Sequence, residues 1–285
     1  MIVILRPFHL FFSVFGRRRG LISKKLQAGV FVLLAFFLFA SYSSHAANRY
    51  SVATGNWSST ATWSATSGGA SGASVPVAGD DVIIEGGFIV TVGILNGVGT
   101  PAAANSVTIL NGTLNFGSGN ATIRQLNVGG TITLSATGTI TVNGVGGAQH
   151  NLNVGGDFTN NGGTFTPVNG AGSILVTFNG GGAQAINGTA ATTNFNNLAV
   201  NKGGGTLSVG GGTTTVGAAT LTLTAGTFSA ATNINITGNF TNNGGTFTPG
   251  AGTVNFTGGG AQAINGTAVS QTFNDITVNK AGGTL

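Results

Sequence analysis

The stretch GDFTNNGGTFTP at Gly156 to Pro167 recurs as GNFTNNGGTFTP at Gly238 to Pro249, 82 positions later. Two further blocks recur 78 positions downstream: GGGAQAINGTA of 180–190 and FNNLAVNKGGGTL of 195–207. Such self-similarity marks a repeat architecture. We place the two copies at about 152–233 and 234–285. The second copy ends in mid-repeat, so we expect the chain to be a fragment of a longer protein.

Apolar residues alternate with polar ones within each copy, as at Ile174, Val176 and Phe178. A period of two indicates β-strands with one buried face. Asn-Gly and Gly-Gly pairs such as Asn187-Gly188 separate these runs and supply the residues that tight turns require. No segment after residue 46 has the period of an amphipathic helix. The sequence therefore predicts an all-β protein.

Two all-β architectures fit a repeat of about 80 residues. One is a parallel β-solenoid (β-helix) with roughly four coils of about 20 residues per repeat. The other is a series of tandem β-sandwich repeats. LNVGG at 126–130 returns at 152–156, and this short spacing favours the coil as the structural unit. We predict the solenoid over residues 101–285.

Residues 47–100 differ in composition and are predicted to be an N-terminal cap that covers the end of the stacked coils. Both tryptophans, Trp57 and Trp63, lie here, together with three of the five carboxylates of the whole chain: Asp80, Asp81 and Glu85.

Residues 1–46 are predicted to be a signal peptide. An apolar run at 28–40 follows two lysines and is too short to span a bilayer as a helix. Ser44-His45-Ala46 has the small-x-small pattern of a cleavage site. Cleavage is expected after Ala46 or, one residue later, after Ala47. An uncleaved membrane anchor is the alternative.

The formal charge of +5 comes from the leader, which holds six of the ten basic residues. The rest of the chain has four basic residues against five acidic ones, a net charge of −1. A nucleic-acid surface needs clustered cations, so that partner is excluded. We expect contact with a membrane only through the leader during export. The chain has no cysteine, which excludes disulfides and thiolate metal sites.

The N-terminal stretches NRYSVATGNWSSTATWS and VPVAGDDVIIEGGFIVTV resemble the opening of repetitive secreted proteins of bacteria that use type IX export. They are more loosely similar to the eight-glycine extracellular domain. The TNNGGTFT and GGAQAING blocks resemble the adhesin-like repeats of the same secreted proteins. The C-terminal sorting domain typical of that route is not visible. The resemblance implies a β-helix-like fold and surface display, and it brings no catalytic residues.

Candidate sites are few. Asp80, Asp81 and Glu85 are weak candidates for a Ca²⁺ site, with turn chemistry as the alternative. Trp57 and Trp63 are candidates for glycan contact, or else they cover an open end of the core.

Three other polar residues are not assigned to a site. His150 is expected in a turn, without the partners that catalysis needs. Lys202 and Lys280, kept in both copies, are expected to be exposed beside glycine turns.

The sequence predicts no cofactor and no catalytic residue, since each acid of the repeat region is replaced in the other copy: Asp157 by Asn239, and Asp275 by Asn197. We expect a non-enzymatic secreted or cell-surface structural protein, adhesin-like, which acts as a stalk or display scaffold. Its expected partners are glycans or other surface proteins, outside the cell. The alternative is a carbohydrate-binding or carbohydrate-active β-helix protein whose active part lies in the N-terminal segment or beyond Leu285.

Overall fold

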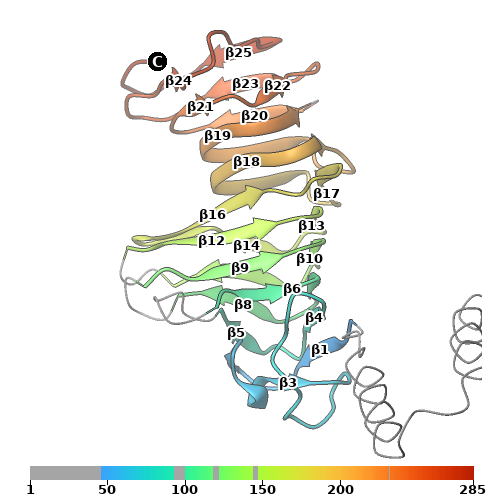
Figure 1. The fold of residues 1–285 in the computed structure, drawn as a ribbon. Coiled ribbons are helices and arrows are strands. Elements are labelled where there is room, and N and C mark those ends of the chain that lie inside the picture. The colour runs from blue at the N-terminus through green and yellow to red at the C-terminus, as the bar shows by residue number, and fades with distance from the viewer. Residues whose placement is uncertain (1–45, 93–99, 118–121, 144–146, 231) are drawn as a thin grey trace, which may run out of the picture. The chain divides into compact units, whose positions relative to one another are not determined.

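Parallel strands stacked coil on coil build the fold (Figure 1). The computed structural model describes residues 46–92, 100–117, 122–143, 147–230 and 232–285, which belong to one unit, Ala46–Leu285. The chain makes about eight turns, and no α-helix is present among these residues. The predicted β-solenoid is confirmed, and the tandem sandwiches are not found.

The parallel strands between residues 48 and 187 fall into three ladders. The first ladder consists of β1 (Asn48–Ser51), β4 (Asp81–Ile84), β7 (Ser106–Ile109), β10 (Ile132–Leu134), β13 (Phe158–Asn160) and β17 (Gln184–Asn187). The second ladder consists of β6 (Ala102–Ala104), β9 (Gln125–Val128), β12 (Gln149–Val154) and β16 (Gly172–Phe178). The third ladder consists of β2 (Gly55–Asn56), β5 (Ile89–Thr91), β8 (Thr113–Phe116), β11 (Thr139–Val142) and β14 (Thr164–Thr166).

The later coils are joined through two long strands, β18 (Thr192–Val209) and β19 (Thr215–Ser229). Both pass from one face of the solenoid to the next, so β18 pairs with β16 and β17, and β19 pairs with three later strands. The remaining strands are β20 (Asn233–Ile236), β21 (Phe240–Asn242), β22 (Thr246–Thr248), β23 (Thr253–Phe256), β24 (Ile264–Asn265) and β25 (Asp275–Val278).

The length of one coil varies along the stack. Val216 pairs with Ile234, 18 positions later, whereas Phe158 pairs with Ile186, 28 positions later. The predicted coil length of about 20 residues therefore lies near the lower end of the observed coil lengths. The strands fix the cross-section, so the turns between them take up the difference.

The two repeat copies occupy different ladders. Phe158 of the first copy lies in the first ladder, between Ile132 and Ile186. Its counterpart Phe240 pairs with Leu221, which continues the second ladder. An 82-residue offset is thus not a whole number of coils, and the second copy is rotated by one face.

Inward-facing side chains stack in rows because paired strands are in register. One row of the second ladder is buried from Leu126 to Phe240, and only the next residue in register, Ile264, is exposed. The buried residues are Leu126, Leu152, Val176, Leu198, Leu221 and Phe240. Burying each such side chain contributes about 1.5–3 kcal/mol.

Each repeat copy also places three phenylalanine rings in mutual contact, with centroids 5.3–5.8 Å apart: Phe158, Phe165 and Phe195 in the first copy, and Phe240, Phe247 and Phe273 in the second. The equivalent core clusters survive the rotation of the second copy.

Glycine is required at Gly188 and its counterpart Gly266, which have φ of +122° and +120°. At Gly188 a Cβ would overlap backbone atoms of Asn160 in the previous coil, and Gly266 has the same relation to Asn242. At these two Asn-Gly pairs the strand ends and the chain bends, in a backbone conformation that favours glycine.

The segment predicted as a cap contributes strands to the ladders, because β1 and β4 pair in parallel and β4 pairs with β7. Between β1 and β4 the chain is irregular. It includes a 3₁₀ turn, η1 (Thr60–Thr62), and β3 (Trp63–Ser64), which pairs antiparallel with β1. This segment lies at the N-terminal end of the stack (Figure 1). A second antiparallel pair joins β15 (Val168–Asn169) to β16.

Candidate functional site

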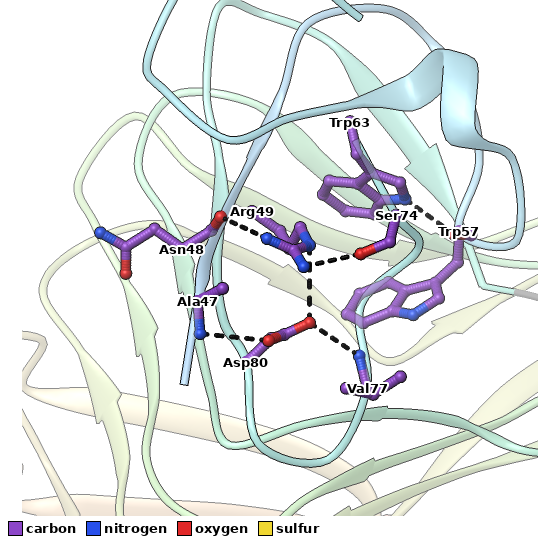
Figure 2. Close-up of polar contacts among 8 residues, drawn as sticks. All are labelled: Ala47, Asn48, Arg49, Trp57, Trp63, Ser74, Val77 and Asp80. Carbon is purple, nitrogen blue, oxygen red and sulfur yellow. Dashed lines mark hydrogen bonds and ion pairs between the residues drawn. The ribbon is translucent and has the colours of Figure 1, made fainter. Parts of the chain in front are cut away.

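Asp80 is the centre of a polar cluster at the N-terminal end of the solenoid (Figure 2). Its carboxylate is buried. Oδ1 accepts a hydrogen bond from the backbone N–H of Ala47 at 3.1 Å, and Oδ2 accepts one from Val77 at 3.1 Å. Arg49 Nε lies 3.5 Å from Oδ2. Asp80 therefore ties the start of β1 to the turn that precedes β4.

Arg49 extends this cluster, since its Nη2 donates to Ser74 Oγ at 2.6 Å and its Nη1 to the carbonyl of Asn48 at 3.1 Å. The guanidinium thus bridges β1 and the irregular segment before Asp80. A partly buried ion pair of this kind positions a loop and also balances the carboxylate charge.

The other two predicted metal candidates do not converge on Asp80. Asp81 Oδ1 accepts hydrogen bonds from Ser106 Oγ at 2.6 Å and Asn105 Nδ2 at 2.8 Å, in the next coil. Glu85 Oε1 accepts one from Ser67 Oγ at 2.6 Å. Within the described part of the chain, no three His, Cys, Asp or Glu side chains form a group that could hold a metal ion.

Trp57 and Trp63 lie in the core, with 3% and 0% of their surfaces exposed. Their rings meet edge to face with centroids 5.3 Å apart, and Trp63 Nε1 donates to the carbonyl of Trp57 at 2.7 Å (Figure 2). This burial leaves neither indole face available to a sugar. The two rings act as hydrophobic packing for the irregular segment, which is the alternative that the sequence left open.

His150 lies in β12 and faces inward, not in a turn as the sequence predicted. Its Nδ1 accepts the backbone N–H of Arg124 at 3.1 Å, and Arg124 Nη1 donates to the carbonyl of Val92 at 2.5 Å. Burial, and secondly the charge of Arg124, lower the pKa of His150. The pair occupies the interior between neighbouring coils.

Lys202 is also buried, with 2% of its surface exposed, so the prediction of an exposed lysine was wrong. Its ammonium donates to the carbonyls of Gly180 and Gly182, both at 2.9 Å, and to Gln184 Oε1. Burial lowers the pKa of Lys202, and the charge of Asp157 opposes this effect. The turn carbonyls replace the water that the ammonium loses.

Gln184 continues the network into the coil before it. Its Oε1 accepts the N–H of Gly180 at 3.0 Å, while its Nε2 donates to the carbonyls of Val154 at 2.9 Å and Gly156 at 2.5 Å. One lysine and one glutamine thus connect three successive coils. We call this arrangement the lysine clamp.

The second copy builds the same lysine clamp. Lys280 donates to the carbonyls of Gly258 and Gly260, both at 2.8 Å, and to Gln262 Oε1 at 2.6 Å. Gln262 Nε2 reaches the previous coil at Ile236 and Gly238, at 3.0 and 2.6 Å. The sequence held a signal for the clamp, because Gln and Lys recur 18 positions apart in both copies.

Comparison with known proteins gives no relative. No protein-family model matches the chain, and no curated protein or solved structure matches it. In the described residues, no helix has the length and hydrophobicity needed to cross a bilayer. The predicted leader, residues 1–46, lies outside the described residues except for Ala46.

Proposed function

We propose that this chain is a non-enzymatic secreted or cell-surface structural protein, adhesin-like, that acts as a stalk or display scaffold. The observation that carries the proposal is the outer surface of the coils. Asn and Thr side chains there hydrogen-bond from coil to coil, as in Asn153 to Asn127 at 2.8 Å and Thr220 to Asn197 at 2.6 Å. Further pairs continue the pattern: Thr159 to Asn187, Thr241 to Asn265 and Asn255 to Asn235.

This surface suits a binding partner with a repeating structure. Strands in neighbouring coils lie about 4.8 Å apart, so equivalent polar side chains recur at that spacing along each ladder. Uncharged amides and hydroxyls offer both hydrogen-bond donors and acceptors, which are the groups that recognise sugars. Several weak contacts along one face would add through avidity. Glycans are therefore the favoured partner, with other surface proteins second.

The roles of the carboxylates support a structural function. Asp80 and Asp81 hold turns and neighbouring coils, and Asp157 Oδ1 accepts the N–H of Ala185 at 2.8 Å. In the second copy Asn239 makes the same bond to Ala263 at 2.9 Å. A position that works equally well as an amide is suited to hydrogen bonding and not to acid–base catalysis.

Two experiments test the proposal. The chain from Ala47 to Leu285 is applied to arrays of immobilised glycans and incubated with a panel of polysaccharides. We expect binding that weakens when Asn127 and Asn153 are both changed to Ala, with no release of sugar fragments. The matched control changes Asn235 and Asn255, which lie on a different ladder, to Ala. It tests whether the loss of glycan binding depends on the ladder that is changed. Turnover of any polymer would overturn the non-enzymatic assignment.

The location is tested on cells that produce the protein. We expect the chain in the medium or on the outer surface, where protease added to intact cells degrades it. A chain found only inside the cells, and protected from that protease, would contradict the proposal. The resemblance to type IX secreted proteins makes that export route the first to test, by deleting its components.

A further inference from the structure

The start of β1 has an arrangement that bears on how the chain is processed. Ala46 is exposed, whereas Ala47 uses both of its backbone groups. Its N–H donates to Asp80 Oδ1 at 3.1 Å, and its carbonyl accepts the N–H of Asp81 at 3.0 Å. The fold therefore holds the backbone of Ala47, one residue before β1.

We propose that a signal peptidase cleaves the Ala46–Ala47 bond and that the new α-ammonium group of Ala47 binds the carboxylate of Asp80. Water is the second reactant: the peptide C–N bond breaks, a hydroxyl group joins the carbonyl carbon of Ala46, and the nitrogen of Ala47 gains the proton. At neutral pH the products are a carboxylate on the leader and an ammonium on Ala47. This inference rests on the proposed export of the chain.

The structure distinguishes the two cleavage positions that the sequence allows. Cleavage after Ala46 keeps both hydrogen bonds of Ala47. Cleavage after Ala47 would remove both and would leave Oδ1 of the buried Asp80 without that donor. A buried carboxylate that loses a hydrogen-bond donor is destabilised. The geometry therefore selects the bond after Ala46.

Cleavage also strengthens the contact with Asp80. In the uncleaved chain the donor is a neutral amide, whereas after cleavage it is a cation. The bond from the amide to the Asp80 carboxylate is already charge-assisted, and the new ammonium adds the attraction between two opposite charges. Asp80 Oδ2 is already bound by Val77 and paired with Arg49, so Oδ1 is the oxygen that the new terminus binds (Figure 2). The mature N-terminus then becomes part of the cluster at the end of the solenoid.

The first test is the N-terminal sequence of the exported protein, which we expect to begin at Ala47. A protein that begins at Asn48, or that retains Ala46, would overturn the assignment. A chain kept inside the cell with its leader intact would show that the proposed export fails. The binding of the terminus to Asp80 is tested separately, with purified chains.

Four chains are prepared by cutting a fusion protein: they begin at Ala46 or Ala47, each with Asp80 or with Asp80→Asn. We expect Asp80→Asn to lower the melting temperature of the Ala47 chain by about 2–4 °C more than that of the Ala46 chain. Both chains lose the ion pair with Arg49, but only the Ala47 chain also loses the pair with its α-ammonium group. Equal losses in both chains would contradict the ion pair.

A second readout does not depend on the folding of the Asp80 variant. The α-amine of each wild-type chain is acylated at pH 7 and followed by mass spectrometry. An ammonium held by a carboxylate is deprotonated less often, so we expect the Ala47 chain to react about tenfold more slowly than the Ala46 chain, a difference equivalent to one pKa unit. Equal rates would contradict the proposal.

Discussion

Replacement of Lys202 by Met tests whether the lysine clamp holds three coils together. Methionine keeps a long apolar side chain at a position that is 2% exposed, but it removes the ammonium. Three acceptors lose the lysine as a donor: the carbonyls of Gly180 and Gly182, and Oε1 of Gln184, which keeps the N–H of Gly180. The cavity created is small, so the change isolates the polar contribution.

The magnitude follows from these three contacts. A hydrogen bond from a charged donor contributes about 1.5–3 kcal/mol. Gly180 is partly exposed and Gly182 is exposed, so water can replace part of what their carbonyls lose. The variant gains back the desolvation of the ammonium, which lowers the pKa of Lys202 in the native chain. We expect a net loss of about 3 kcal/mol from the free energy of unfolding.

Hydrogen exchange measured residue by residue is the suitable assay, because coils of a solenoid can open locally. We expect faster exchange in β17 and in the adjoining part of β18, with little change in β4 and β7. Lys280→Met is the matched control: it removes the same three contacts from a less buried lysine and should cost less. A loss below about 0.5 kcal/mol for Lys202→Met, the size typical of surface substitutions, would refute the clamp.

Three further predictions concern single positions. Gly188→Ala should lower the free energy of unfolding by about 2 kcal/mol or more, because the φ of Gly188 is positive and a Cβ there would overlap the previous coil. Gly181→Ala is the control, since a Cβ at Gly181 meets no atom within 4 Å, and it should leave the free energy of unfolding nearly unchanged. Urea titration measures both. The free energy of unfolding of Asp157→Asn should stay within about 0.5 kcal/mol of the parent value. Asp157→Ala removes the hydrogen bond to Ala185 and should lower the free energy of unfolding by about 1 kcal/mol, as measured by thermal unfolding. The pKa of His150 is lowered in the folded chain, so the imidazole binds a proton more readily in the unfolded chain. The free energy of unfolding should therefore be highest above the ordinary pKa of 6.5 and should fall as the pH drops below that value. His150→Asn should weaken that acid sensitivity, and an unchanged pH profile would show that other groups cause it.

Local patterns in the sequence were sufficient for the strands and the turns. Alternation at Ile174, Val176 and Phe178 places these side chains inside β16, as expected from a period of two. The chain bends at Gly188, directly after β17, where a Cβ would overlap the previous coil. The short return of LNVGG also identified the true structural unit, since Leu126 and Leu152 pair directly in adjacent coils.

Side-chain environments were predicted less well. Lys202 and His150 are polar residues beside glycines, and the sequence placed them in solvated turns. Burial of such residues depends on partners from other coils, namely Gly180 and Gln184 for Lys202, and Arg124 for His150. The tryptophans were assigned two alternatives because an aromatic ring suits a binding face and a core equally, and only packing decides between them.

The sequence by itself determined the all-β class and the repeat, because strand periodicity and turn residues are local properties. It favoured the solenoid over tandem sandwiches through the short return of LNVGG, and the tertiary structure decided between the two. The tertiary structure decided how the copies align. A long-range offset of 82 residues does not show how many residues each coil contains. Between the two copies the coils vary from 18 to 28 residues, and this variation rotates the second copy by one ladder. It also brought Ala47 to Asp80, 33 positions away, through the register between β1 and β4. Contacts of this kind arise from strand pairing across coils, which no local pattern specifies.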